Sequence, residues 1–136
     1  MTEDAKRMRD NDELLHRQVH PNFIQDGRVT SSAFKPFPRD EGKLSVDRDS
    51  LASAQEAYEL YTKEKELDSA GTWSVTVGEC DELGLPCFED PIEEQVPDPA
   101  HALIDFTDLR KSQSKKRAKK LRDRATDRGA TFRPAM

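Results

Sequence analysis

The stretch that decides the fold is residues 73–78, which read WSVTVG. Trp73, Val75 and Val77 alternate with small polar residues. β-Branched and aromatic residues at a period of two are typical of a strand that turns one face to the core. The glycine that follows ends the pattern. We therefore expect a β-strand here, and a strand needs partners elsewhere in the chain.

Three further segments have the alternation of half-buried strands. In one of them, Leu44 and Val46 alternate with Ser45 and Asp47. The three segments are residues 14–20, 43–48 and 101–106. Together with residues 73–78 they predict a small, mainly antiparallel sheet.

A helix is expected over residues 51–66. Ser53 and Glu56 have the spacing of a capping box, in which each side chain accepts a hydrogen bond from the other residue's backbone N–H. Asp49 or Ser50 could cap the helix one turn earlier. An apolar stripe follows at helical spacing and would lie on the sheet; its members are Leu51, Ala54, Tyr58 and Tyr61.

A second helix is expected over residues 111–128, and Gly129 ends it. Its apolar stripe is narrow, with only Ala118, Leu121 and Ala125 on one face. A short helical turn is expected at residues 79–85. The resulting fold class is α+β, with a small, mainly antiparallel sheet, one packed helix and an appended basic C-terminal helix.

The chain divides into three parts. Residues 1–13 carry many charges and little that could pack, so we expect a mobile N-terminal tail. Residues 14–107 form the α+β domain, which includes an acidic, proline-rich loop at 89–99. The irregular stretch is expected to begin at Pro86. Residues 108–136 form the basic helix and its tail.

The amino-acid composition indicates which cellular environment to expect for the protein. Of the 136 residues, 34% are apolar and 36% are charged, and the mean hydropathy is −0.91. No run approaches the roughly 20 apolar residues of a membrane span, and the N-terminus lacks the apolar segment of a signal peptide. We expect a soluble, cytoplasmic protein without membrane contact, in which Cys80 and Cys87 remain free thiols.

Charge is divided unevenly along the chain. Residues 1–107 hold 11 Lys and Arg against 24 Asp and Glu, a net charge of −13, whereas residues 108–136 hold 11 against 3, a net charge of +8. Such asymmetry is typical of a chain that binds an acidic partner through its basic part or docks that part on itself. The binding residues we expect on the helix are Lys115, Lys116, Lys119, Lys120, Arg122 and Arg124.

The nature of that partner is constrained by what the helix lacks. No aromatic residue is interleaved among the cations for base stacking, and no zinc-finger, homeodomain or RNA-recognition motif accompanies them. Nucleic acid is possible, but the acidic body would compete with it for the helix. A protein partner is therefore favoured.

Motifs for catalysis and cofactors are absent from the sequence. There is no Gly-x-Ser-x-Gly elbow, no Walker A loop and no Gly-x-Gly-x-x-Gly fingerprint. The two cysteines are not spaced as a zinc pair, and the three histidines are scattered. We expect no metal and no cofactor.

One alternative rests on the layout of residues 14–77. A first strand with His16 and Arg17, a serine loop at Ser31, and a helix with Tyr58 resemble the NAD-binding half of small ADP-ribosyltransferase-type folds. The resemblance implies that His16 or Arg17 holds the nicotinamide ribose and that an aromatic stacks on the ring. The chain departs from that pattern at the late catalytic Glu, for which neither Glu79 nor Glu89 is well placed.

The sequence is therefore compatible with two functions. The first is a non-catalytic binding or accessory protein, such as a small regulator, an antitoxin or immunity-like factor, or a complex subunit, that acts through its charged surfaces. The second is a small ADP-ribosyltransferase-like enzyme that acts on NAD through His16, Arg17, Ser31 and Tyr58.

Overall fold

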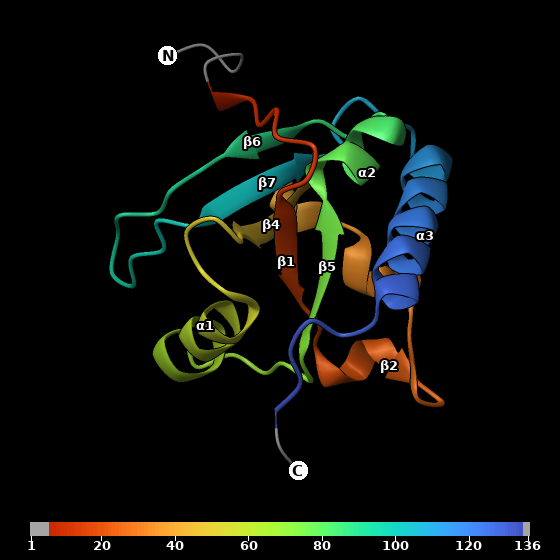
Figure 1. Ribbon diagram of the computed structural model, residues 1–136. Coiled ribbons are helices and arrows are strands. Elements are labelled where there is room, and N and C mark those ends of the chain that lie inside the picture. Colours follow the sequence, from red (N-terminus) through yellow and green to blue (C-terminus); the bar gives the residue numbers. More distant parts are fainter. Residues whose placement is uncertain (1–5, 135–136) are drawn as a thin grey trace.

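The computed structural model describes residues 6–134, and it has the α+β fold that the sequence predicts. A five-stranded antiparallel sheet has the order β5-β1-β4-β7-β6 (Figure 1). Its strands are β1 (Leu14–Gln18), β4 (Lys43–Arg48), β5 (Thr72–Thr76), β6 (Cys87–Glu89) and β7 (His101–Asp105). A small hairpin pairs β2 (Ile24–Gln25) with β3 (Arg28–Val29). The α-helices are α1 (Ala54–Glu59), α2 (Val77–Glu82) and α3 (Lys111–Arg128).

Short helical turns connect these elements. Of the turns that join strands and helices within residues 14–128, three are 3₁₀ turns and one is a π-helical turn that continues α1. They are η2 (Pro21–Phe23), η3 (Ser31–Phe34), η4 (Pro38–Asp40) and η5 (Leu60–Glu64).

Four of the five strands lie where the sequence places them, and β6 does not. The expected irregular stretch after Pro86 contains an edge strand, in which Cys87 pairs with Ile104 and Glu89 with Ala102 of β7. A strand of three residues is too short for a period-two pattern to stand out.

The strand expected over residues 73–78 ends two residues early. Thr76 Oγ1 accepts a hydrogen bond from the backbone N–H of Glu79 at 3.0 Å, and the Glu79 carboxylate accepts one from the backbone N–H of Thr76 at 2.8 Å. This capping box starts α2 at Val77. Val77 is therefore the first residue of a helix and not the last of a strand.

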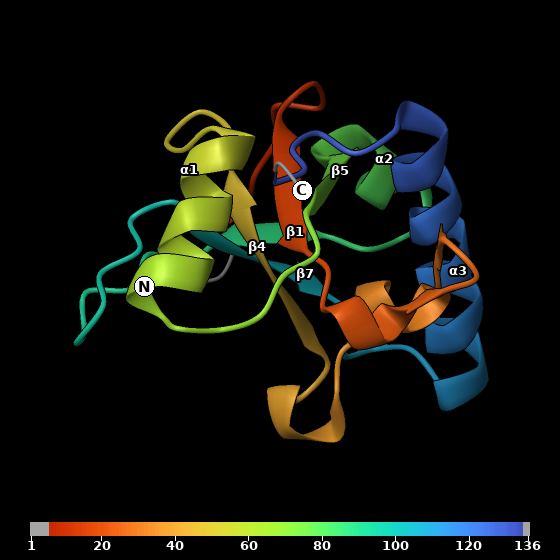
Figure 2. The same ribbon diagram turned by 90° about the horizontal axis from the view of Figure 1, so that it is seen from below.

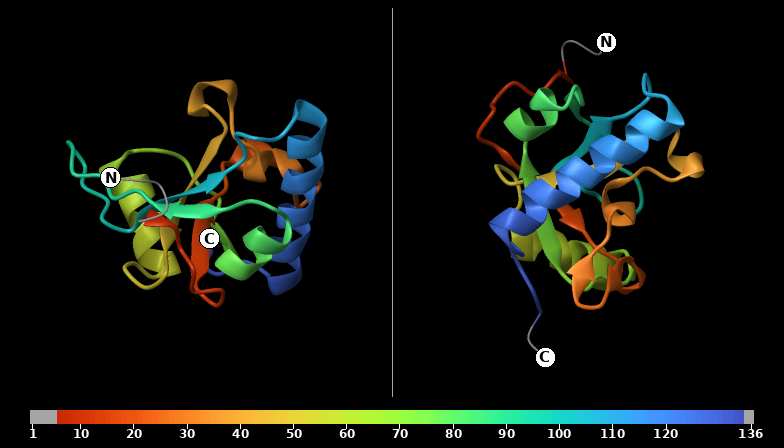
Figure 3. Two further views of the ribbon diagram at one scale, coloured as in Figure 1. Left: turned by 90° about the horizontal axis from the view of Figure 1, so that it is seen from above. Right: turned by 90° about the vertical axis from the view of Figure 1, so that its right-hand side faces the viewer.

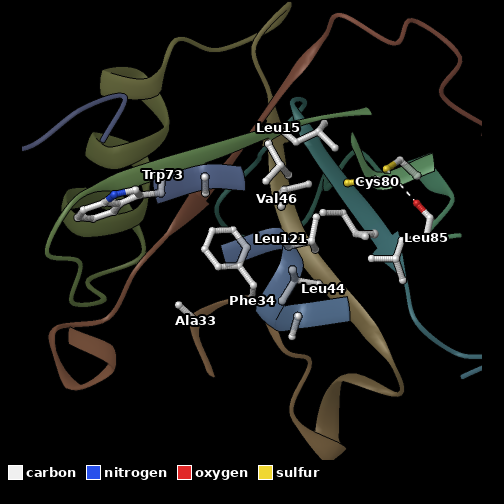
Figure 4. Packing of buried hydrophobic residues seen from close by; sticks show 14 of the residues in the cluster. Leu15, Ala33, Phe34, Leu44, Val46, Trp73, Cys80, Leu85 and Leu121 are labelled. Carbon is white, nitrogen blue, oxygen red and sulfur yellow. Dashed lines mark hydrogen bonds between the residues drawn. The ribbon is translucent and has the colours of Figure 1, made fainter. Parts of the chain in front are cut away.

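The two longer helical segments lie on opposite faces of the sheet (Figure 2). Helix α3 runs obliquely across one face, where it contacts β5 and η3 (Figure 3). Its expected stripe of Ala118, Leu121 and Ala125 is at most 1% exposed. The apolar side chains of the sheet meet this helix, as Figure 4 shows for Leu15, Leu44 and Leu121.

Helix α1 covers less of the core than its sequence pattern suggests. Ser53 and Glu56 form the expected capping box, with hydrogen bonds of 3.1 and 2.9 Å. Within the helix only Ala57 is buried, and Leu51 precedes the helix and is 56% exposed. Because α1 brings few apolar side chains to the sheet, the face of the sheet beneath it can accommodate polar side chains.

The N-terminal segment is tied to the sheet as far as it is described. Residues 1–5 of the expected tail lie outside the described residues. Met8 is 4% exposed, and its backbone N–H donates to the carbonyl of Cys87 at 2.9 Å. Glu13 binds Arg48 and Ser50, which lower its carboxyl pKa despite the opposing effect of burial. Residues 6–13 are thus anchored to the domain at Met8 and Glu13, while residues 9–12 between these anchors are exposed.

Within residues 6–134, no helix is long and apolar enough to cross a membrane. Cys80 and Cys87 are both free and buried, as expected for thiols that pack as small apolar groups. Burial and a hydrogen bond to Cys87 raise the pKa of the Cys80 thiol. Both thiols belong to the core.

Candidate functional site

A row of polar side chains crosses four strands on the face of the sheet toward α1. Ser74 of β5 pairs with His16 of β1, His16 pairs with Asp47 of β4, and Asp47 pairs with His101 of β7. Each is at most 8% exposed. Because alternate residues of a strand point to opposite faces, this row lies behind the apolar row that includes Leu15. Burying so many polar groups requires that each finds a partner.

His16 uses both ring nitrogens. Nδ1 lies 2.7 Å from Ser74 Oγ, Nε2 lies 2.9 Å from Asp49 Oδ1, and Ser74 Oγ lies 2.7 Å from Thr131 Oγ1. Burial lowers the pKa of the imidazole, and Asp49 offsets this only in part. The ring is therefore neutral at pH 7.

The hydrogen-bonded chain Ser74–His16–Asp49 has the residue types of a catalytic triad, but a substrate cannot reach its serine hydroxyl. Ser74 is 0% exposed, and its hydroxyl is also bound by Thr131 from the segment that follows α3. A nucleophile must reach the substrate carbonyl, which this hydroxyl cannot do. The three residues fasten the C-terminal segment to the sheet.

Next to the polar row, β1 and β4 separate and leave a cavity. Their ladder ends at the pairs Leu15–Arg48 and His16–Asp47. A cavity of about 290 Å³ follows, roofed by η5 and the acidic loop. It adjoins a second cavity of about 350 Å³, and the two share Arg17, Gln18, Phe37, Tyr61 and Leu67. We call the two together the η5 groove.

Arg17 closes the gap between the separated strands. Its Nε donates to the carbonyl of Ala33 at 2.8 Å, and Nη1 donates to the carbonyl of Ser45 at 2.9 Å. Burial lowers the pKa of the guanidinium, which nonetheless remains charged at neutral pH. Arg17 thus replaces the strand hydrogen bonds that β4 lacks at this point and joins it to η3.

The acidic loop delivers a carboxylate to the inner end of the groove. The loop folds back on itself through a bridge between Ile92 and Asp98, and the Asp98 side chain is 2% exposed. Asp98 is hydrogen-bonded to Asp47, and Lys65 Nζ lies 3.4 Å from Asp98 Oδ2. Burial and the charge of Asp98 raise the pKa of Asp47 to about 8. The two carboxyl groups therefore share one proton at neutral pH.

Two buried polar atoms of the groove have no partner among the described residues. These are Gln18 Nε2 and Asp47 Oδ1, on side chains that are each 8% exposed. The Gln18 carbonyl oxygen accepts from the hydroxyls of Ser69 at 2.9 Å and Thr72 at 3.1 Å, so its amide nitrogen points away from them. An unpaired buried polar group costs about 1–3 kcal/mol. Both atoms therefore require partners that residues 6–134 do not supply.

The four residues of the transferase alternative do not line one cavity. His16 and Arg17 line the inner part of the η5 groove, but Ser31 and Tyr58 line neither part. Ser31 begins η3, which packs against α3. The Tyr58 ring packs on Phe132 at a centroid distance of 5.1 Å.

The cations of α3 fall into two groups. Its arginines hold the helix to the domain: Arg117 binds the carbonyl of Leu83, Arg122 that of Val29, and Arg128 that of Ser74. Arg124 and Arg128 also form ion pairs with Glu82 and Glu79, as the opposite charges of body and helix suggest. Two of the six expected binding residues, Arg122 and Arg124, are thus engaged within the chain.

The lysines of α3 remain available. Lys111, Lys115, Lys116, Lys119 and Lys120 are exposed, and none forms an ion pair or hydrogen bond with another described residue. They lie in the N-terminal two-thirds of the helix, away from its buried stripe. We call these five residues the lysine face.

Sequence reasoning missed the residues at the centre of the groove. Gln18, Asp47, Lys65 and Asp98 were not singled out, although Gln18 and Asp47 occupy the polar positions of predicted strands. That alternation was the only available signal. Within the described residues, no group of three His, Cys, Asp or Glu side chains could hold a metal ion.

Comparison of the chain with protein-family models, curated proteins and solved structures gives no match. Function must therefore be argued from the two features above, the lysine face and the η5 groove.

Proposed function

We propose that this protein is a non-catalytic binding or accessory protein that contacts an acidic protein partner through the lysine face of α3. The observation that carries the proposal is the division of cations on that helix. Arginines secure it to the domain, while five exposed lysines have no partner within the described chain. Lysine ammonium groups are strongly hydrated, and they are therefore better suited to the solvent-exposed rim of an interface, opposite acidic side chains, than to its desolvated centre.

The packing of α3 against the core supports a binding surface whose backbone is fixed before a partner binds. Ala118, Leu121 and Ala125 anchor α3 in the core, so a partner would meet a helix whose backbone is already held in place. Preorganisation of this kind lowers the entropic cost of association. Glu82 and Glu79, which pair with Arg124 and Arg128, lie on α2, so binding at the lysine face would not require the helix to detach.

The test is a matched pair of charge-reversal variants. In the first, Lys115, Lys116, Lys119 and Lys120 are changed to Glu. In the control, the exposed residues Arg9, Arg28, Lys43 and Lys63 are changed to Glu, which alters the net charge equally. Both variants are compared with wild type for capture of proteins from native lysate, with and without nuclease treatment.

The expected result is one reproducible set of captured proteins that the control retains and the lysine variant loses. Capture should also weaken between about 50 and 500 mM salt, because salt screens exposed charges. Equal capture by all three proteins contradicts the proposal, and capture that disappears on nuclease treatment assigns the face to nucleic acid.

The transferase alternative has no comparable support, because its four residues do not meet in one cavity. It would require release of nicotinamide from NAD by the wild type and not by His16→Ala.

A further inference from the structure

The η5 groove has a polar inner end and an apolar mouth. Gln18 and Asp47 lie at the inner end, each 8% exposed and each with one unpartnered atom. Phe37 and Leu67, which are 36% and 47% exposed, line the groove and are two of the three exposed large apolar side chains of the described chain. A concave site with an apolar lining and a few converging polar groups is the usual form of a small-molecule site.

The unpartnered atoms specify what a ligand must offer. Gln18 Nε2 is a donor and needs an acceptor, whereas Asp47 Oδ1 is an acceptor and needs a donor. Gln18 and Asp47 stand on neighbouring strands and on the same face of the sheet, since His16 pairs with Asp47 and Gln18 lies two residues further along β1. A ligand with a donor and an acceptor along one edge would satisfy both atoms.

The charges that line the groove favour a neutral ligand. Inside, Arg17 and Lys65 are balanced by Asp40 and Asp98, and Asp47 shares its proton with Asp98. The outer part adds the acidic residues Glu66 and Asp68, of which Asp68 lies 3.8 Å from His20. Carboxylates there would repel a phosphate group but can accept hydrogen bonds from hydroxyls.

Aromatic side chains supply flat surfaces beside the polar end. Phe37 and Tyr61 line both parts of the groove, and Phe23 lines the outer part and lies 5.8 Å from Phe37 between ring centroids. Aromatic rings stack on planar heterocycles, and each stacked base contributes appreciably to binding. The inner volume of about 290 Å³ and the adjoining 350 Å³ give room for a ring and a sugar.

We propose that the η5 groove binds a neutral nucleobase or nucleoside. The donor and acceptor along the edge of the base meet Gln18 Nε2 and Asp47 Oδ1, the ring lies against Phe37 and Tyr61, and the sugar hydroxyls extend toward Glu66 and Asp68. This site is independent of the lysine face, which lies on the helix covering the other side of the sheet (Figure 2).

The experiment is a titration of the full chain, followed by backbone amide NMR, with adenosine, guanosine, cytidine or uridine as separate probes. Each probe is raised to about 10 mM, which detects binding as weak as a millimolar Kd. Matching 5′-monophosphates and glucose serve as charged and polyol controls. The expected result is saturable binding of at least one nucleoside, with shifted resonances confined to the residues of the η5 groove.

Two variants test the contacts. Gln18→Leu removes the donor, and Asp47→Leu removes the acceptor. Each should weaken nucleoside binding at least about tenfold, whereas Lys119→Gln on the lysine face should leave it unchanged. A monophosphate should bind more weakly than its nucleoside.

Three results would overturn the proposal. They are the absence of groove shifts with every nucleoside in wild type, glucose binding without nucleoside binding, and equal binding by wild type and by a folded Gln18→Leu protein. The wild-type titration decides even if both variants fail to fold. Loss of partner capture at the lysine face would leave all of these outcomes unaffected.

Discussion

Asp47 and Asp98 face each other across the inner end of the η5 groove and share a hydrogen bond, although one lies on β4 and the other in the acidic loop. Two buried carboxyl groups in contact cannot both be charged without a large electrostatic penalty. Lys65, 3.4 Å from Asp98, stabilises one negative charge on the pair. The ionisation of this carboxyl pair is therefore coupled to the free energy of unfolding.

The first prediction concerns the pH dependence of that stability. The pKa of Asp47 is raised from 3.8 to about 8, so between these values the folded state holds a proton that the unfolded state has lost. The free energy of unfolding should therefore fall as the pH rises from about 4 to 8. Asp47→Asn cannot ionise and should show a smaller fall. Urea denaturation at several pH values measures both slopes.

Several titratable groups face Asp47, so the difference between the two slopes, and not either slope alone, reports the ionisation of Asp47. The groups that face Asp47 come from the acidic loop, the residue after η5 and the neighbouring strands, and they are Asp98, Lys65, His16 and His101. His16, with its lowered pKa, contributes the opposite sign below pH 6.5, because the unfolded state binds a proton that the folded state does not. Parallel curves for wild type and Asp47→Asn would contradict the assignment.

The second prediction tests whether α3 is part of the core. Leu121 is 0% exposed, and its replacement by Ala removes buried apolar volume. We expect Leu121→Ala to lower the free energy of unfolding by about 2–5 kcal/mol. Leu51→Ala is the matched control, because Leu51 is 56% exposed and should change stability by less than about 0.5 kcal/mol. Equal losses in the two variants would mean that α3 does not pack as described.

The third prediction concerns the ion pair that joins α3 to α2. Arg128 binds both carboxylate oxygens of Glu79, at 3.0 and 3.1 Å. Burial alone would raise the pKa of Glu79. Arg128 and the Thr76 backbone N–H together lower the pKa by more than burial raises it, so the net shift is downward. A double-mutant cycle with Glu79→Gln and Arg128→Gln should give a coupling energy of about 1 kcal/mol at neutral pH.

That coupling should weaken as the pH falls below the ordinary range of a Glu carboxyl, because the folded-state stabilisation is lost when Glu79 is protonated. Persistence of the full coupling in acid would show that the two side chains interact through packing and not through charge.

The fourth prediction addresses His16. Asp49 raises the pKa of its imidazole against the larger lowering by burial. Asp49→Asn should therefore lower the pKa of His16 further below 6.5, as measured by NMR titration of the ring nitrogens. His20, whose side chain is 38% exposed, provides the reference signal in the same spectra. An upward shift of the His16 pKa in Asp49→Asn would refute this account of the Ser74–His16–Asp49 chain.

Local patterns were sufficient for most of the fold. The alternation at Trp73 and Val75, the capping box at Ser53 and the ending of α3 at Gly129 depend on residues a few positions apart, and all three are found in the structure. The same locality explains the misses. Val77 fits a strand pattern, yet the capping box between Thr76 and Glu79 makes it helical, and both signals were present in the sequence.

The candidate groove could not be foreseen in the same way. Gln18, Asp47, Lys65 and Asp98 come from four separate segments, and nothing in their local sequence relates one to another. The basic helix was identified from composition, but not the engagement of Arg122 and Arg124 by its own domain.

The sequence by itself determined the elements and the charge division, because hydrophobic period, caps and net charge are properties of neighbouring residues. Only the tertiary structure decided which polar groups meet. Strand register set His16 beside Asp47, the fold of the acidic loop brought Asp98 to the same place, and the docking of α3 separated arginines that bind the domain from lysines that do not. Burial and contact between distant segments create these sites, and neither is encoded in any single stretch of the chain.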